Sequence, residues 1–200
     1  MSQDIRQFSQ VLSPDFCQAL IQKFLSDERV EADPQPDYST RRFLYLSDKS
    51  DWAPLLAELQ GVADRLVAEY FAGFACEQSP GPEDWFDDGF VLAHYRPGDT
   101  CILHDDGQNP EPPNNGFRLA TLLFYLNDVS VGGETIFPRQ TFSAKPEQGK
   151  AILFPSTYAY PHRVAAPTTD RFVLQTWIID PGMVVNWRQS WEESENCGDS

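Results

Sequence analysis

Two histidines and an aspartate have the residue types expected of a catalytic metal site. In a β-strand, side chains two positions apart point to the same face, so His104 and Asp106 would offer an imidazole and a carboxylate to one cation. Two ligands are too few for a catalytic metal. A second imidazole from a distant strand would give two histidines and one carboxylate, a set that leaves coordination positions open on ferrous iron. His162 is the candidate for this third ligand.

Other residues could compete for the same role. Cys101 and His104 form a Cys-x-x-His pair, but a zinc site needs two more ligands of this kind at short spacing. His94 has no carboxylate two positions later, so hydrogen bonding within the fold is its simpler role. Glu134 lies in a sequence that predicts a tight turn. We therefore keep His104, Asp106 and His162 as the predicted ligands.

Arg171 is the second residue that could do chemistry. It begins a predicted strand and would share one strand face with Val173, Gln175 and Trp177. If that face points inward, a buried guanidinium needs an anion, and its fork of N–H groups matches a carboxylate. A diacid that binds iron at one end and Arg171 at the other would satisfy both groups. The alternative is a surface ion pair between Arg171 and an acidic side chain.

The elements that must position these residues are mostly strands. Ser13 and Pro14 predict the start of an amphipathic helix that runs to residue 25, and a second apolar stripe predicts a helix at about 51–73. The polar, proline-containing sequence of residues 31–40 predicts a loop. Residues 42–46 predict one strand, and turn signals separate about eight more, which lie at 90–95, 101–104, 118–127, 135–138, 141–144, 150–154, 158–164 and 171–180. This pattern predicts a mainly β (α+β) fold, a jelly roll of two sheets flanked by N-terminal helices.

Length and charge limit the function further. The 200 residues predict a single domain over 1–200, with a helical layer and first strands in 1–87, a jelly-roll core in 88–182 and an acidic tail in 183–200. The formal net charge of −15 would repel a phosphate backbone, so we expect no nucleic-acid partner. The sequence does not predict an oligomeric state.

Localisation is predicted from the absence of targeting signals and from the cysteines. No basic segment followed by an apolar run opens the chain, and no run of about 18 apolar residues occurs, so we expect neither export nor membrane insertion. The four cysteines do not have the spacing of a disulfide framework; they are Cys17, Cys76, Cys101 and Cys197. We expect reduced thiols and a cytoplasmic protein.

Residues 88–180 resemble a known family, the prolyl 4-hydroxylase-like branch of the Fe(II)/2-oxoglutarate-dependent dioxygenases. The resemblance rests on an ordered set of motifs: 95–99 (YRPGD), 104–106 (HDD), 123–129 (LFYLNDV), 132–138 (GGETIFP), 161–162 (PH) and 171–177 (RFVLQTW). The basic residue nine positions after the distal histidine is part of this order. The N-terminal helix also resembles the family's support layer.

The resemblance implies a role for each candidate residue. His104, Asp106 and His162 would bind Fe(II), and Arg171 would pair with the distal carboxylate of 2-oxoglutarate. Four further residues would line the cosubstrate pocket or pack against it, namely Tyr95, Thr121, Tyr125 and Trp177. The implied cofactors and cosubstrates are Fe(II), 2-oxoglutarate and O2, with ascorbate in addition. No catalytic residue beyond these ligands is implied, since the protein mainly orients the reactants and excludes other reactions.

The implied reaction is oxidative decarboxylation of 2-oxoglutarate to succinate and CO2, coupled to hydroxylation of a C–H bond. The leading hypothesis is a peptidyl proline as the substrate, and the second is a free amino acid or another small molecule. A hypothesis of a different class is a non-catalytic, cupin-like binding module. This third hypothesis predicts that Arg171 faces solvent or that the three metal ligands do not bind iron.

Overall fold

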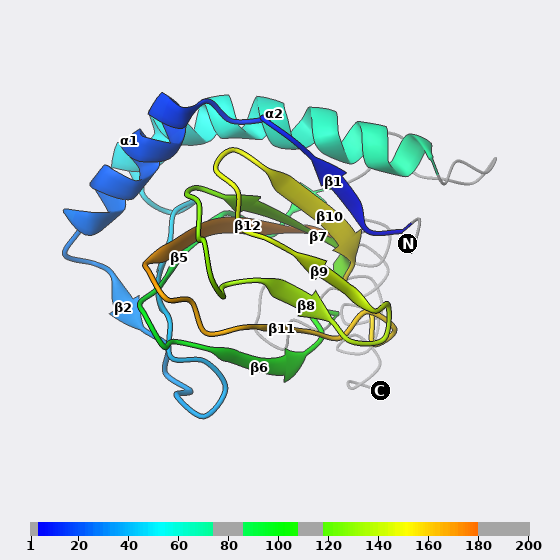
Figure 1. Cartoon of the computed structure of the whole chain (residues 1–200). Helices are drawn as coiled ribbons and strands as arrows, with labels where there is room; N and C mark the ends of the chain where they lie inside the picture. Colours follow the sequence, from blue (N-terminus) through cyan, green and yellow to red (C-terminus); the bar gives the residue numbers. More distant parts are fainter. Residues whose placement is uncertain (1–3, 74–85, 108–117, 180–200) are drawn as a thin grey trace, which may run out of the picture.

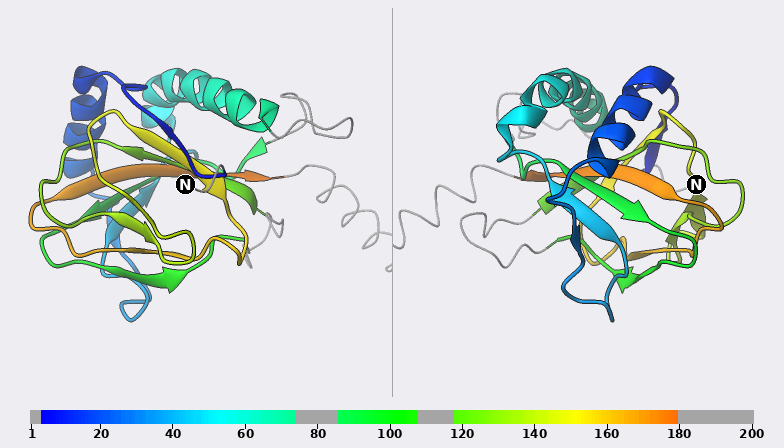
Figure 2. Two further views of the ribbon diagram at one scale, coloured as in Figure 1. Left: turned by 45° about the vertical axis from the view of Figure 1, so that its right-hand side comes forward. Right: turned by 90° about the vertical axis from the view of Figure 1, so that its left-hand side faces the viewer.

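Two antiparallel β-sheets and two α-helices make up the described part of the chain. The computed structural model describes residues 4–73, 86–107 and 118–179 (Figure 1). The two sheets lie face to face, and both helices cover the outer face of the larger sheet, as the turned views show (Figure 2). The predicted jelly roll with N-terminal helices is confirmed.

The larger sheet has the strand order β1-β10-β7-β12-β5-β3-β2, and β4 pairs with β12. Its strands are β1 (Arg6–Phe8), β2 (Glu31–Ala32), β3 (Arg42–Tyr45), β4 (Phe86–Asp87), β5 (Val91–Tyr95), β7 (Arg118–Tyr125), β10 (Ala151–Pro155) and β12 (Arg171–Ile179). The smaller sheet has the order β6-β11-β8-β9, with β6 (Cys101–His104), β8 (Thr135–Phe137), β9 (Phe142–Ala144) and β11 (His162–Val164). This order makes β6 and β11 direct neighbours, although they are far apart in the sequence.

The helices form where the sequence predicts them. Helix α1 (Pro14–Leu25) is capped by the Ser13 hydroxyl, which accepts a hydrogen bond from the backbone N–H of Phe16 at 3.2 Å. A short 3₁₀ turn, η1 (Ser50–Trp52), leads into α2 (Ala53–Ala72). Within the described residues, neither helix combines the length and the apolar character needed to cross a bilayer.

Strand β12 separates two cores. All nine of its residues are buried. Phe172, Leu174 and Ile178 pack into the core between the larger sheet and the helices, whereas Val173 packs into the core between the two sheets. Because side chains alternate along a strand, Arg171 shares the face of Val173 and points into the space between the sheets. The inward orientation considered for Arg171 is therefore the one observed.

The structure differs from the sequence expectation in the number of strands. One strand at 42–46 and about eight more were predicted, but the described residues contain twelve; β1, β2 and β4, which have two or three residues each, were not predicted. Residues 31–40 were expected to be loop throughout, yet they begin with β2. A segment of two residues has no measurable alternation, so only its pairing in the folded protein defines it as a strand. The predicted acidic tail, 183–200, lies outside the described residues.

Candidate metal centre

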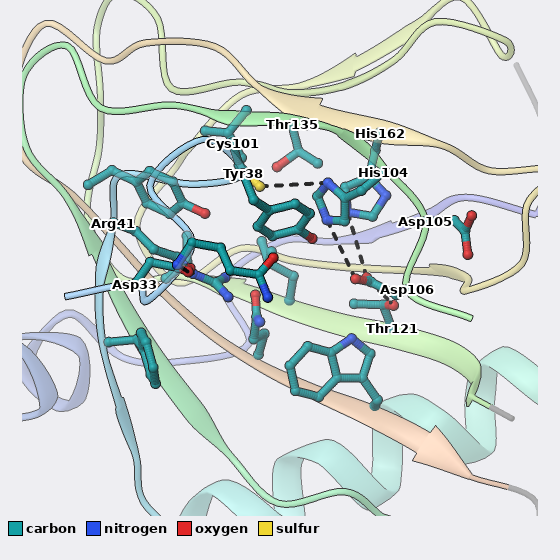
Figure 3. A pocket seen from close by; sticks show the side chains of 18 of the residues that line it. Asp33, Tyr38, Arg41, Cys101, His104, Asp105, Asp106, Thr121, Thr135 and His162 are labelled. Carbon is teal, nitrogen blue, oxygen red and sulfur yellow. Dashed lines mark hydrogen bonds and ion pairs between the residues drawn. The ribbon is translucent and has the colours of Figure 1, made fainter. Parts of the chain in front are cut away.

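The three predicted metal ligands converge at one end of the smaller sheet. His104 ends β6, His162 begins β11, and the two residues are paired across the strands. Nε2 of His104 lies 3.6 Å from Oδ1 of Asp106, and Nε2 of His162 lies 3.6 Å from Oδ2 (Figure 3). One ligand atom from each residue can be chosen so that all lie within 4.8 Å of one another. This spacing suits a single shared cation.

Backbone carbonyls orient both imidazoles. Nδ1 of His104 lies 2.8 Å from the carbonyl oxygen of Ile102, and Nδ1 of His162 lies 3.3 Å from that of Tyr160. A carbonyl only accepts, so Nδ1 carries the proton in both contacts and donates it. Nε2 is then the nitrogen of each ring that faces Asp106 and that can offer its lone pair to a metal ion.

The electrostatics of the three ligands favour a cation. Burial alone would raise the pKa of Asp106, but His162 and His104 outweigh it and hold the pKa well below its usual range. Burial alone would lower the pKa of His104, but Asp106 and Cys101 raise it to about 11. Burial lowers the pKa of His162. Three groups therefore face one point. They are the ionised carboxylate of Asp106, the neutral imidazole of His162 and the imidazole of His104, whose proton a metal ion can displace.

Arg171 lies in the same cavity with unused hydrogen-bonding capacity. Its side chain is 1% exposed, and its guanidinium carbon lies 4.8 Å from the centre of the Tyr95 ring and 5.5 Å from that of Tyr125. Nη2 donates a hydrogen bond to the Thr135 hydroxyl at 3.2 Å, while Nε and Nη1 are buried without a partner among the described residues. A buried cation with two unpaired donors is costly, and a carboxylate would satisfy it.

One cavity joins the two features. It has a volume of about 300 Å³, and both Arg171 and the three converging ligands, His104, Asp106 and His162, line it. A cation and an acid can therefore be held in one space, and the donor set fits Fe(II) and a diacid.

Residues 90–179, from just before β5 to the end of β12, match the sequence model described as the 2OG-Fe(II) oxygenase superfamily. The matched stretch includes all three converging ligands and Arg171. Over these 90 of its 200 residues, the chain is similar to that superfamily. The matched superfamily implies Fe(II), 2-oxoglutarate and O2, as the resemblance predicted.

Curated proteins similar to part of this chain are named prolyl hydroxylases. The chain is 44% identical over 75 residues to "Probable prolyl 4-hydroxylase 11" of Arabidopsis thaliana. The aligned stretch covers 32% of this chain and 28% of the relative. It is 36% identical over 106 residues to "Prolyl 4-hydroxylase subunit alpha-1" of Gallus gallus. This aligned stretch covers 46% of this chain and 20% of the relative. The chain thus spans under a third of the length of either relative.

Solved structures share the fold of this protein. A prolyl hydroxylase from Trichoplax adhaerens, in complex with a hypoxia inducible factor peptide fragment, superposes with a TM-score of 0.72 at 16% identity and covers 92% of this chain and 87% of its own. The viral collagen prolyl hydroxylase of Paramecium Bursaria Chlorella virus-1 superposes with a TM-score of 0.66 at 18% identity. This superposition covers 90% of the present chain and 97% of the viral chain. At these identities the likeness concerns the fold alone.

The remaining predicted site residues have distinct positions. Tyr95 is paired with Arg171 across β5 and β12, and Tyr125 donates a hydrogen bond to the Thr135 hydroxyl at 2.8 Å. Trp177 lines the cavity, and its ring lies 3.7 Å from the guanidinium carbon of Arg118. Tyr95 and Trp177 line the cavity, whereas Tyr125 contacts the lining residue Thr135; the contacts of all three with 2-oxoglutarate stay a prediction.

His94, considered as a competing ligand, is placed on the other side of the sheet. Its Nε2 lies 2.8 Å from Oδ1 of Asp170, and its ring stacks on Phe172 at 4.3 Å. The ring also meets Phe24 of α1 edge-on. His94 thus packs between the sheet and the helix, where it helps to hold the residues on either side of Arg171.

Thr121 contacts a metal ligand. Thr121 lines the same cavity, and its hydroxyl donates a hydrogen bond to Oδ2 of Asp106 at 2.8 Å; its contact with 2-oxoglutarate stays a prediction. The Ser156 hydroxyl lies 2.8 Å from the same oxygen of Thr121, and both side chains are 1% exposed. With Thr121 donating to Asp106, the Ser156 hydroxyl donates to Thr121. No sequence pattern marks Ser156, which directly follows β10.

Replacing Thr121 with valine is expected to weaken metal binding by about tenfold, because the isosteric side chain removes the hydrogen bond that orients Asp106. Ser156→Ala should have a smaller effect in the same direction. Titration of the apoprotein with Co(II) or Mn(II) measures the change. Thr176→Val is the matched control, since the Thr176 hydroxyl is buried without a partner among the described residues. Equal affinities for Thr121→Val and wild type would contradict this role.

Metal binding is expected to strengthen as the pH rises. The pKa of His104 is raised to about 11, so in the metal-free protein this imidazole keeps its proton at neutral pH and must release it to bind a cation. His162, with a lowered pKa, is already neutral there. One proton released per ion gives an apparent affinity that rises about tenfold per pH unit. Calorimetric titration in buffers of different ionisation enthalpy counts that proton; a pH-independent affinity would contradict the expectation.

Three residues that line the cavity come from the connection between β2 and β3. Residues 31–40 of this region were predicted to be a loop. The Tyr38 ring meets His104 edge-on at 5.1 Å, and Nε of Arg41 lies 3.2 Å from Oδ2 of Asp33. All three side chains line the cavity. Burial alone would lower the pKa of Arg41, but Tyr95, together with Cys101 and Asp33, outweighs burial and raises it. No local pattern marks these residues, since their relation to His104 exists only in the folded protein.

Proposed function

We propose that this protein is an Fe(II)- and 2-oxoglutarate-dependent dioxygenase that hydroxylates a peptidyl proline and releases succinate and CO2. The observation that carries the proposal is one cavity with two histidines and an aspartate at one place and the buried, partly unpaired guanidinium of Arg171 at another. The names of the relatives, which are prolyl hydroxylases of plant and animal origin, support the substrate class.

Each residue has a simple task in this reaction. Fe(II), with 2-oxoglutarate and O2, would supply the oxidation that inserts one oxygen atom into the C–H bond. His104, Asp106 and His162 would hold the cation through Nε2, a carboxylate oxygen and Nε2. Arg171 would pair with the distal carboxylate of 2-oxoglutarate and so orient it. Carbonyl oxygens behind the two imidazoles keep their Nε2 atoms directed inward.

The alternative functions have less support. A non-catalytic binding module would leave Arg171 without a reason to be buried, and its side chain is 1% exposed. Hydroxylation of a free amino acid or another small molecule needs the same metal and cosubstrate residues, so it differs only in the substrate. The relatives named as prolyl hydroxylases favour the peptidyl substrate.

The decisive experiment supplies the purified chain with Fe(II), 2-oxoglutarate and O2, and then with candidate substrates. These are a synthetic peptide of repeated Pro-Pro-Gly triplets, a hypoxia inducible factor degradation-domain peptide and free L-proline. We expect succinate, and a peptide whose mass increases by one oxygen atom. Succinate without any product from the panel supports the chemistry and rejects those substrates. No succinate from metal-loaded protein contradicts the proposal.

Two further expectations belong to the proposal. We propose ascorbate as an additional cofactor that keeps the iron reduced, which turnover with and without ascorbate tests. We also propose a cytoplasmic location; Cys17 and Cys101, the two cysteines in the described residues, are both free thiols. Fractionation of cells that express the protein tests the location.

A further inference from the structure

The connection between β2 and β3 places a phenol beside the metal centre. The Tyr38 ring lies edge-on to the His104 ring at 5.1 Å, and its hydroxyl lies on the side of the metal ligands (Figure 3). The ring packs against the core between the two sheets, and the side chain lines the cavity. Among the described residues, no hydrogen bond to the Tyr38 hydroxyl is found. A phenol in such a position can donate a hydrogen bond to a molecule in the cavity.

The backbone around Tyr38 is firmly held. Its carbonyl oxygen accepts a hydrogen bond from the backbone N–H of Ile102 at 3.0 Å, and Thr40 donates to the carbonyl oxygen of Thr100 at 3.1 Å. An isolated bridge joins Ser39 to Cys101. These contacts attach the segment to β6, the strand that carries His104, so Tyr38 and the metal ligand keep a constant relative position.

An ion pair closes the base of the same segment. Nε of Arg41 lies 3.2 Å from Oδ2 of Asp33, and the two side chains are 18% and 8% exposed. The backbone N–H of Asp33 also donates to the carbonyl oxygen of Arg41 at 3.0 Å. Because this pair is largely shielded from water, it braces the segment more strongly than a surface pair would. Residues 33–41 thus form a preorganised wall of the cavity.

We infer that Tyr38 contacts the substrate and donates a hydrogen bond to a peptide carbonyl beside the residue to be hydroxylated. This inference rests on the proposed function. The proposed metal ion would have three protein ligands. They are His104 at the end of β6, Asp106 just after β6, and His162 at the start of β11. The proposed cosubstrate anchor, Arg171, is instead surrounded by Tyr95, Tyr125 and Thr135. The remaining reactants are O2 and the substrate, and of these a peptide substrate offers carbonyl oxygens that accept a hydrogen bond from a phenol.

The test compares Tyr38→Phe with wild type in three binding measurements. Both full chains are titrated calorimetrically with Mn(II), then with 2-oxoglutarate, and then with the Pro-Pro-Gly and degradation-domain peptides, so that no turnover occurs. We expect unchanged affinity for the metal and for 2-oxoglutarate. Peptide affinity should fall about tenfold, which corresponds to about 1.4 kcal/mol. Tyr158→Phe is the matched control, because Tyr158 is 77% exposed and the loss of its hydroxyl should change none of the three affinities.

The kinetics of the iron-loaded protein give a second readout. For Tyr38→Phe we expect a higher KM for the peptide, an unchanged KM for 2-oxoglutarate and fewer hydroxylated peptides per succinate released. Asp33→Asn should shift the same quantities less, because backbone hydrogen bonds still hold the segment. A changed affinity for metal or 2-oxoglutarate, unchanged peptide affinity, or no peptide binding to wild type would each overturn the inference. Substrate-independent succinate formation reports separately on the proposed chemistry.

Discussion

Replacement of His162 or Asp106 by alanine is expected to abolish 2-oxoglutarate turnover. Each change removes one of three ligand atoms that lie within 4.8 Å of one another, and two remaining protein ligands hold a divalent cation poorly. We expect succinate formation to fall by about a thousandfold or more. The measurement is succinate released by protein incubated with Fe(II) and 2-oxoglutarate, together with the iron content after desalting.

The neighbouring carboxylate provides the control for this result. Oδ1 of Asp105 accepts a hydrogen bond from the backbone N–H of Gly107 at 3.1 Å, and its side chain points away from the two imidazoles (Figure 3). Asp105→Asn keeps an acceptor at this position and should retain both iron and turnover. If both alanine variants kept wild-type turnover, the assigned metal centre would be wrong.

Replacement of Arg171 by methionine is expected to raise the KM for 2-oxoglutarate by about a hundredfold. A carboxylate that loses its guanidinium partner in a water-poor cavity forfeits about 2–5 kcal/mol, and a hundredfold change corresponds to about 2.7 kcal/mol. Metal affinity should not change, since Arg171 is not among the three converging ligands. Steady-state kinetics with varied 2-oxoglutarate, and Mn(II) titration of the same variant, measure the two quantities.

A stability measurement separates this binding role from a structural one. In the protein without cosubstrate, Nε and Nη1 of Arg171 are buried without a partner among the described residues. An uncompensated buried charge destabilises the fold, so Arg171→Met should unfold at the same temperature as wild type or a higher one. Added 2-oxoglutarate should stabilise metal-loaded wild type and not the variant. A variant that unfolds at a lower temperature, with an unchanged KM, would show that Arg171 serves the fold alone.

Local sequence patterns predicted the long elements well. The Ser13 cap and the apolar stripes of α1 and α2 are helical signals, and the continuous apolar run of β7 indicates a strand buried on both faces. Alternation and residue type also singled out His104 and Asp106. Three short strands outside any predicted strand were missed, and only pairing with a neighbour makes β1, β2 and β4 part of a sheet.

By itself, the sequence determined the jelly roll, the three residues that converge as a candidate metal site and the strand that carries Arg171. These features follow from chemistry and periodicity within single segments. Only the tertiary structure decided that Arg171 is buried, that Thr121 and Ser156 support Asp106, and that Tyr38 lies against His104. Each of these depends on the register and packing of segments distant in the chain, and the pattern within one segment contains no information about its neighbours in space.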